Sequence, residues 1–415
     1  MEKITVNNVH IDKQTIAIFF SVTDGLSPYF IPPNVFITEY NQDLIDLPEN
    51  IAVIPFLCNI LPIIWLTNSE LILDEIDQDF YNSIDCFKKG YIQMYPMLSF
   101  QGTISAKKII ENTPSQQNHC ACFFSAGIDA FATLIAHLSD KPDLISLRGS
   151  DIDLNDSDGW RNFETTLAKT KRLFDFSQKK VTSNFRKIIN EGLLNSLVTL
   201  SGDGWWHGFQ HGIGLIGHAA PLAYLNGYKK VYIASSYTIR EKGVITCASD
   251  PSIDNYVKFC KTEIIHDQYE FSRQEKVEHI CNYISQTNIE IPLHVCWESK
   301  GGKNCCHCEK CYRTIAEIIA EKGDPTKFNF LFDSNIFSTM KKDIHKKIYM
   351  APHIIVVWKD IQQRLKQQHN FKYCSQLSWI KQFNFDKVNS TFSKRVHKAY
   401  IKFWSIIHSI YGGFK

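Results

Sequence analysis

The fold is decided by a short run of apolar, small and acidic residues that reads Phe123-Phe124-Ser125-Ala126-Gly127-Ile128-Asp129-Ala130-Phe131-Ala132-Thr133-Leu134. The apolar residues before Ser125 predict a buried β-strand, and the apolar residues after Asp129 recur at helical spacing. Small residues between them predict a tight turn. We therefore expect a strand, a turn and a helix that begins near Asp129.

Such a turn can bind a phosphate. Backbone N–H groups and the positive end of the helix dipole point at it, and small residues at Ser125, Ala126 and Gly127 allow close approach. Ser125 can add a hydroxyl donor, and Asp129 can cap the helix or hold Mg²⁺. An ordinary strand-to-helix turn stays the alternative, because Ser, Gly and Asp are common turn residues. The predicted nucleotide-binding residues are Ser125, Ala126, Gly127, Ile128, Asp129 and Ala130.

The residues around this turn predict an α/β domain over 115–320. Short apolar runs at Ala121–Phe124, Leu144–Leu147 and Val231–Ala234 alternate with helical patterns. Strands that alternate with helices indicate a doubly wound parallel sheet, with a ligand crevice at the carboxyl ends of the strands. The helical patterns cover Ala130–Leu138, Trp160–Phe174 and Ile213–Leu225.

Four cysteines near the end of this region have the spacing of a metal site. Cys305, Cys308 and Cys311 form C-x2-C-x2-C, and Cys296 precedes them. Four thiolates can surround one tetrahedral Zn²⁺ and leave no open position, which is typical of a structural site. An iron–sulfur cluster is the alternative. Cys306 is expected to be a bystander, and His307 could replace a ligand only if its neighbours reoriented.

The phosphate loop and the cysteine spacing, followed by Tyr312-Arg313, together resemble the 7-cyano-7-deazaguanine synthase family of the pyrophosphatase-loop ATPase superfamily. The resemblance covers residues 118–318. Two residues depart from the SGGxDS loop of that superfamily. Ala126 stands at a Gly position, a mild change if its φ is negative, and Ala130 replaces a Ser whose hydroxyl would face phosphate.

The resemblance implies an adenine-nucleotide alpha-hydrolase-like fold and an ATP-dependent, C–N bond-forming ligase that releases AMP and pyrophosphate. In that family the carboxylate of 7-carboxy-7-deazaguanine is adenylated, ammonia attacks, and a second ATP drives formation of the nitrile for queuosine synthesis. Extended relatives occur in antiphage gene clusters, where the acceptor is thought to be an amine of a partner protein. The implied cofactors are ATP, Mg²⁺ and structural Zn²⁺, and a protein from the same operon is an expected partner.

Further nucleotide and catalytic residues are predicted near strand ends. Arg148 and Gly149 follow Leu144–Leu147, where this fold class meets adenine. Arg186 follows the next expected strand and suits phosphate or carboxylate. A surface charge is the alternative for both arginines.

Two later segments add four candidates. His207 and His211 lie in Trp205–Gly214, whose aromatic pair and glycines indicate close packing near a ligand. The alternative for both is a hydrogen-bonded core histidine. Arg273 and Lys276 lie in a polar segment that lines the substrate pocket in the resembled family.

The flanking regions are predicted to be separate. Residues 1–100 predict an α+β accessory domain, with strands at Ile4–Val9, Thr15–Val22 and Val35–Tyr40 and a helical pattern at Leu71–Phe87. Residues 326–415 predict a basic helical region, with helices at His345–Lys366 and Phe392–Ile410. That region carries 16 Lys and Arg against 4 Asp and Glu, whereas the first 325 residues carry 29 against 39.

The composition of the chain excludes several classes of protein. With 44% apolar and 21% charged residues and a net charge of +2, the chain is neither disordered nor a polycation. The longest apolar stretch, Ile51–Leu66, is too short to span a bilayer and is expected to be buried. No signal peptide is read, so a cytoplasmic location is expected. A tRNA-modifying (thiolation-type) ATPase and a non-catalytic nucleotide-binding scaffold of a defence complex remain alternative functions, and nucleic-acid binding by the basic tail is the less favoured expectation.

Overall fold

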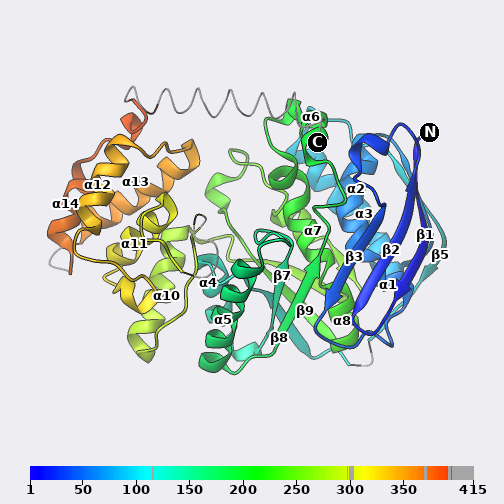
Figure 1. Ribbon diagram of the computed structural model, residues 1–415, viewed down its shortest axis with the longest axis horizontal. Helices are drawn as coiled ribbons and strands as arrows, with labels where there is room; N and C mark the ends of the chain where they lie inside the picture. The colour runs from blue at the N-terminus through cyan, green and yellow to red at the C-terminus, as the bar shows by residue number, and fades with distance from the viewer. Residues whose placement is uncertain (115, 297, 299–302, 369–371, 391–393, 395–415) are drawn as a thin grey trace. The chain divides into compact units, whose positions relative to one another are not determined.

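The computed structural model describes residues 1–114, 116–296, 298, 303–368, 372–390 and 394. Contacts divide the chain into two compact units, whose elements are labelled in Figure 1. Unit 1 comprises Met1–Phe124, His137–Asn155 and Phe176–Glu270. Unit 2 comprises Ser125–Ala136, Asp156–Asp175 and Phe271–Lys415.

Unit 1 contains one large, mostly parallel sheet. Within the described residues it has 11 strands in the order β10-β11-β9-β6-β7-β8-β3-β2-β1-β4-β5. The run from β11 to β8 is parallel throughout, as is the run β1-β4-β5, and antiparallel pairings link β8 to β3, β3 to β2 and β2 to β1. The strands are β1 (Lys3–Ile11), β2 (Thr15–Val22), β3 (Val35–Tyr40), β4 (Glu70–Asp77), β5 (Thr103–Ile110), β6 (His119–Phe123), β7 (Asp143–Arg148), β8 (Gln178–Ser183), β9 (Tyr228–Ala234), β10 (Lys258–Phe259) and β11 (Thr262–Asp267).

The N-terminal strands continue the sheet of the central strands. Thr38 of β3 pairs with Ser183 of β8, so the sheet passes without a break from the region predicted as an accessory domain into the central α/β region. The predicted strands at β1, β2, β3, β6, β7 and β9 are confirmed. The helical pattern predicted for Leu71–Phe87 is wrong in its first half. Residues Glu70–Asp77 form β4 because Leu71 and Leu73 alternate with more exposed neighbours at the strand period, and α3 begins only after Asp77 caps it.

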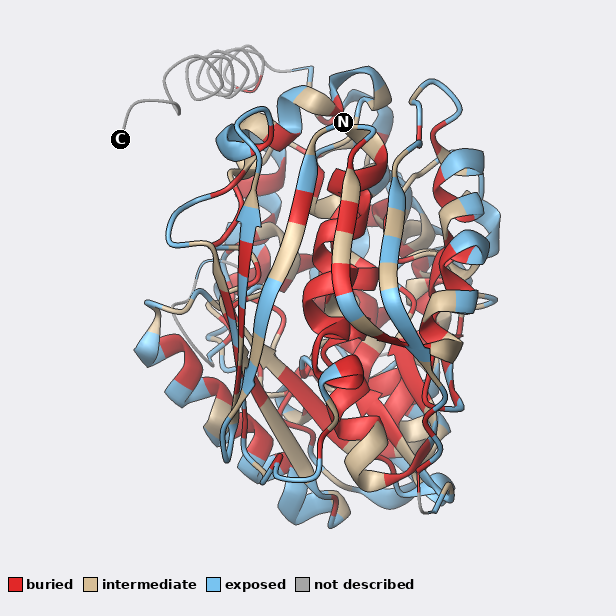
Figure 2. Ribbon diagram, turned by 90° about the vertical axis from the view of Figure 1, so that its right-hand side faces the viewer, coloured by how far each residue is buried: buried red, intermediate tan, exposed pale blue. Residues whose placement is uncertain are grey.

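The core of unit 1 is built around an apolar helix. Every residue from Ile54 to Trp65 in α2 is buried, as expected for a helix that is apolar all round. The predicted burial of Ile51–Leu66 is confirmed as far as Trp65, and Leu66 is half-buried. Figure 2 shows exposed and buried residues alternating along the N-terminal strands, with buried helical residues behind them. The helices of this unit are α1 (Glu49–Ala52), α2 (Ile54–Leu66), α3 (Gln78–Met94), α6 (Glu191–Leu197), α7 (His211–Gly217), α8 (Ala220–Asn226) and α9 (Pro251–Asp254).

Unit 2 is helical in its described part. Helix α10 packs against α4 and α11, and α11 packs against α13. Arg364 of α13 forms a bidentate pair with Glu321, with nitrogen–oxygen distances of 2.7–2.9 Å, so part of the positive charge of the C-terminal region is neutralised within the unit. The helices are α4 (Ile128–Ala136), α5 (Ser157–Phe174), α10 (Arg273–Thr287), α11 (Glu309–Ala320), α12 (Ile336–Lys346), α13 (Pro352–Gln367) and α14 (Cys374–Gln382).

Two predicted helices are each divided in two. Ile213–Leu225 forms α7 and α8, and His345–Lys366 forms the end of α12 and α13. In both cases a proline, Pro221 or Pro352, stands in the first turn of the second helix, where its missing N–H is tolerated and its fixed φ starts a new helix. The predicted helix at Phe392–Ile410 lies outside the described residues except for Lys394.

The observed architecture confirms an α/β fold with a large, mostly parallel sheet. The described part of the chain contains no helix that is both long and apolar enough to cross a bilayer. The doubly wound arrangement and the three-part domain division stay predictions.

Candidate functional site

The predicted strand, turn and helix are present. Residues Ser125–Gly127 connect β6 to α4, which begins at Ile128. Ser125 is exposed, Gly127 and Asp129 are half-buried, and Ala126, Ile128 and Ala130 are buried. The first N–H groups of a helix have no partner inside it, so the start of α4 places such donors next to exposed Ser125.

Ala126 is held in an unusual backbone conformation. Its φ is +59°, in the left-handed region, which costs a non-glycine residue about 1–2 kcal/mol. The replacement of glycine at this position is therefore not the mild change expected for a negative φ. The Ala126 carbonyl accepts a hydrogen bond from the His294 N–H at 2.9 Å, which ties the turn to the segment just before Cys296.

Two cations from α10 converge on the start of α4. Arg273 Nη1 lies 3.3 Å from one oxygen of Asp129, and Lys276 Nζ lies 3.5 Å from the other. The side chains of Lys276 and Arg273 are 1% and 13% exposed. The structure thus brings together three predicted residues, although 144 positions separate Asp129 from Arg273.

Helix α11 supplies two further residues that the sequence reasoning missed. Arg273 Nε donates to both oxygens of Glu317, at 3.0 and 3.2 Å, and Nη2 donates to the Thr314 hydroxyl at 3.3 Å. The Glu317 side chain is fully buried. No local motif marks Glu317, because its partner lies on another helix.

The carboxylates around Arg273 keep its guanidinium protonated. Desolvation by itself would lower the pKa of Arg273, but the nearby carboxylates of Glu317 and Asp129 outweigh it and raise that pKa. The guanidinium is therefore a permanent, oriented cation beside the first turn of α4. Two cations and two carboxylates balance here, so an anion that displaced Asp129 would contact Lys276 and Arg273 while Glu317 kept its ion pair with Arg273.

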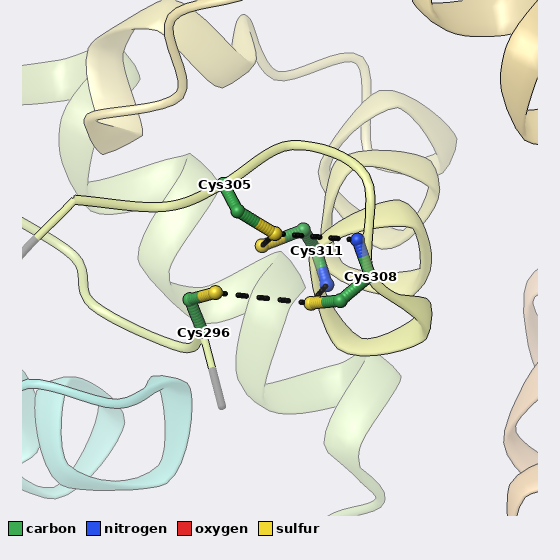
Figure 3. A group of neighbouring side chains, drawn as sticks. All are labelled: Cys296, Cys305, Cys308 and Cys311. Carbon is green, nitrogen blue, oxygen red and sulfur yellow. Dashed lines mark hydrogen bonds between the residues drawn. The ribbon is translucent and has the colours of Figure 1, made fainter. Parts of the chain in front are cut away.

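The four predicted cysteine ligands form one compact group (Figure 3). The Sγ atoms of Cys296, Cys305, Cys308 and Cys311 lie within 4.8 Å of one another, with Cys296–Cys308 and Cys305–Cys311 separations of 3.9 Å. Four sulfurs at about 2.3 Å from a tetrahedral Zn²⁺ would lie about 3.8 Å apart. This group could hold a metal ion, and its spacing fits zinc.

Backbone N–H groups and thiols of this group donate hydrogen bonds to its sulfur atoms. The Cys305 sulfur accepts from the N–H groups of His307 and Cys308, at 3.4 and 3.3 Å, and the Cys308 sulfur accepts from the Cys311 N–H at 3.4 Å. Hydrogen bonds from the Cys311 thiol lower the pKa of Cys308 to about 5, while donating to Cys308 raises the pKa of Cys311. Adjacent thiols can all ionise only if a cation neutralises them.

The neighbouring Cys306 and His307 point elsewhere. Cys306 Sγ donates to the Asn304 carbonyl at 3.5 Å, and His307 Nδ1 lies 2.6 Å from the Cys305 carbonyl. Neither belongs to the four-sulfur group. Because α11 begins at this group and carries Glu317 farther along, metal ligands and the partner of Arg273 share one helix.

The other predicted site residues belong to unit 1 and make their contacts within that unit. Gly149 follows β7 with φ +104°, and a Cβ there would come within 2.0 Å of the Ser183 carbonyl oxygen, so this turn requires glycine. Arg148 donates to the Leu154 carbonyl. Arg186 pairs with Glu191 at 2.8 Å and stacks on the ring of Trp206, 4.2 Å from its centroid.

His207 and His211 both act on a residue that the sequence reasoning did not single out, because they lower the pKa of the Cys247 thiol. His207 Nε2 lies 3.1 Å from the Tyr237 hydroxyl. His207 lies in a π-helical turn, Trp206–Gln210, and His211 begins α7; Asp203 Oδ1 lies 2.9 Å from His207 Nδ1. The Asp203–His207 spacing of four residues is the one local signal for this cluster; the Cys247 partner lies far along the chain.

Comparison with known proteins adds no identification. No protein-family model, no curated protein and no solved structure matches this chain.

Proposed function

We propose that the chain is an ATP-dependent, C–N bond-forming ligase of the pyrophosphatase-loop type. It adenylates a 7-deazaguanine-type carboxylate and transfers the acyl group to an amine, either ammonia or an amine of a partner protein in an antiphage system. The proposal includes a doubly wound arrangement around the Ser125–Asp129 turn.

One observation carries the proposal. Arg273, whose side chain is 13% exposed, and buried Lys276 meet at Asp129 in the first turn of α4, directly after the small residues Ser125, Ala126 and Gly127. A helix start and two oriented cations are groups that a polyphosphate requires.

The chemistry follows from these groups. A carboxylate is a poor electrophile until its oxygen becomes part of a good leaving group. Arg273 and Lys276 would neutralise charge on the α-phosphate while the substrate carboxylate attacks, and pyrophosphate would leave. Asp129 would then release its cation partners and could hold Mg²⁺, which supplies charge neutralisation to the phosphates when bound.

The cysteine group would hold structural Zn²⁺. Cys296 lies two residues after His294, whose N–H holds the Ala126 carbonyl. The Asn304 side chain braces the same segment through the Val295 N–H at 3.0 Å and the Leu293 carbonyl at 2.9 Å. Binding of a metal ion by the four cysteines would therefore restrain the Ser125–Asp129 turn.

The test is formation of AMP and pyrophosphate from ATP in the presence of 7-carboxy-7-deazaguanine. We expect acid-dependent release by the unaltered chain and loss of at least tenfold in rate for Lys276→Met, since it removes a charge-assisted contact. Arg161→Met is the matched control, because its ion pair with Asp158 is exposed. Equal loss in both variants would contradict the role assigned to Lys276.

Binding of ATP without turnover would favour the non-catalytic scaffold. Ala130, which replaces the hydroxyl-bearing residue of the resembled loop, motivates this comparison. Ala130→Ser should then produce no turnover, whereas in a ligase it should raise the rate.

A further inference from the structure

Three side chains at the edge of the four-cysteine group form a second set of metal-ligating atoms. One carboxylate oxygen of Glu298, one imidazole nitrogen of His307 and the sulfur of Cys305 lie within 4.8 Å of one another. Carboxylate, imidazole and thiolate are all ligands that Zn²⁺ accepts in proteins. We call these three residues the outer set. Cys305 also belongs to the four-sulfur group, so one sulfur is common to two adjoining sets of ligands.

The ring of His307 is oriented as a metal ligand requires. Its Nδ1 lies 2.6 Å from the Cys305 carbonyl oxygen, which can only accept, so in the neutral ring Nδ1 carries the proton and Nε2 carries the lone pair. Histidines that bind metals commonly donate their other ring N–H to a backbone carbonyl in this way. The backbone N–H of His307 also donates to Cys305 Sγ at 3.4 Å. The imidazole and the shared sulfur are thus held together in one short turn.

Exposure distinguishes the outer set from the rest of the four-sulfur group. The side chains of Cys296, Cys308 and Cys311 are 7%, 6% and 0% exposed, whereas Cys305 is half-buried. Glu298 and His307 are both exposed. A buried metal site needs a path by which the ion enters. A hydrated ion can reach the outer set directly, and Cys305 is the member of the four-sulfur group that is most open to solvent.

The two sets also differ in how firmly they can hold an ion. Four sulfurs complete a tetrahedral shell, which is typical of structural zinc, whereas three ligands leave one position for water. The carboxylate and the thiolate of the outer set together neutralise the two charges of Zn²⁺. The outer set therefore suits an ion that binds briefly, and the four-sulfur group suits an ion that stays.

We propose that Glu298, His307 and Cys305 form an outer site that binds Zn²⁺ from solution and passes it to the four-cysteine group. The inference rests on the proposed binding of zinc by that group. Glu298 and His307 leave the ion one after the other as the three buried sulfurs replace them, and each buried thiol gives its proton to water. The Cys305 sulfur stays bound throughout. Because a thiolate has lone pairs for two metal ions, the outer site can also take up an ion while the four-cysteine group is filled.

The first test is the exchange of bound zinc with added Zn²⁺ that is enriched in one stable isotope, followed by mass spectrometry of the full chain. Glu298→Gln combined with His307→Gln should slow the exchange at least tenfold, because two of the three outer ligands are lost, and should keep one zinc ion per chain at equilibrium. The matched control is Glu290→Gln with His279→Gln. It alters an exposed carboxylate and an exposed imidazole outside both sets and should leave the exchange rate unchanged.

Three outcomes of this experiment would overturn the proposal. Exchange that is as fast in the Glu298 and His307 double variant as in the control would mean that the ion enters by another route. Loss of zinc from that variant at equilibrium would mean that these residues bind the resident ion itself. An unaltered chain that holds no zinc would contradict the four-cysteine site, and the outer site with it.

The second test is modification of His307 by diethyl pyrocarbonate in the zinc-loaded chain, read by peptide mass spectrometry. Zn²⁺ added beyond one equivalent should slow the modification of His307 at least tenfold and leave that of exposed His279 unchanged. Mg²⁺ at the same concentration should protect neither residue, since it prefers oxygen ligands. Equal effects of Zn²⁺ on both histidines, or no protection of His307, would contradict the assignment. Neither test uses ATP, so both are independent of the proposed ligase activity.

Discussion

Replacing Arg273 with Met is expected to destabilise unit 2 strongly. Arg273 Nε donates to both oxygens of Glu317, at 3.0 and 3.2 Å, and the Glu317 side chain is fully buried. Removing the cation leaves a buried carboxylate without its charge partner, which costs about 3–5 kcal/mol. The contact to Asp129 adds less, because that side chain is 23% exposed and keeps Lys276 as a partner.

A double-mutant cycle in urea unfolding measures this effect. Glu317→Leu in the Arg273→Met background should recover much of the loss, because a buried ion pair replaced by apolar groups is often close to neutral. The coupling energy should therefore exceed about 2 kcal/mol. Arg161→Met with Asp158→Leu, which alters an exposed pair, should give a coupling energy below about 1 kcal/mol.

A loss of less than about 1 kcal/mol of unfolding free energy in Arg273→Met would contradict this prediction, since that is the range of an exposed ion pair. A double variant that is no more stable than Arg273→Met alone would also contradict it. Either result would mean that Glu317 is not desolvated as the structure shows.

Three further predictions follow from the other sites. Cys308→Ser should lower metal affinity at least tenfold, whereas Cys306→Ser should keep one metal ion per chain by inductively coupled plasma mass spectrometry; equal metal content in both variants would contradict the four-ligand assignment. The raised pKa of His207 contributes stability that is fully present below the unfolded-state pKa of about 6.5 and is lost as the pH rises towards about 11. The difference in unfolding free energy between the unaltered chain and His207→Gln should therefore shrink from pH 7 to pH 10. A difference that stays constant over this range would refute the prediction. Gly208→Ala should lower the melting temperature because the added Cβ would come within 2.6 Å of the Tyr95 hydroxyl and 2.9 Å of Asp203, whereas Gly192→Ala, whose Cβ would meet Asn190 only at 3.5 Å, should not lower it; equal losses would contradict this reasoning.

Local patterns predicted the elements that depend on neighbouring residues. The strand, turn and helix around Ser125–Asp129 and the four-cysteine group could be predicted because their residues lie close together along the chain. The strand β4 was missed, since its alternation of Leu71 and Leu73 runs directly into the helical period of α3. Alternation over a few residues is easily read as part of the helix that follows.

Partners that meet only in the folded chain could not be predicted. Glu317 carries no motif, and its role comes from the packing of α11 against α10. Cys247 stands alone in the sequence, and only the fold brings its neighbour Ala248 to His207, whose carbonyl accepts from the Ala248 N–H at 2.8 Å. The sign of φ at Ala126 was equally out of reach, because the hydrogen bond from His294 joins segments far apart in the sequence.

We propose above all that the Ser125–Asp129 turn binds the triphosphate of ATP for adenylation. Pyrophosphate exchange tests it most directly, by following labelled pyrophosphate into ATP with and without 7-carboxy-7-deazaguanine. The account predicts exchange that requires the acid and is lost in Lys276→Met but kept in Arg161→Met. Tight ATP binding with no acid-dependent exchange, or exchange that persists in Lys276→Met, would contradict it.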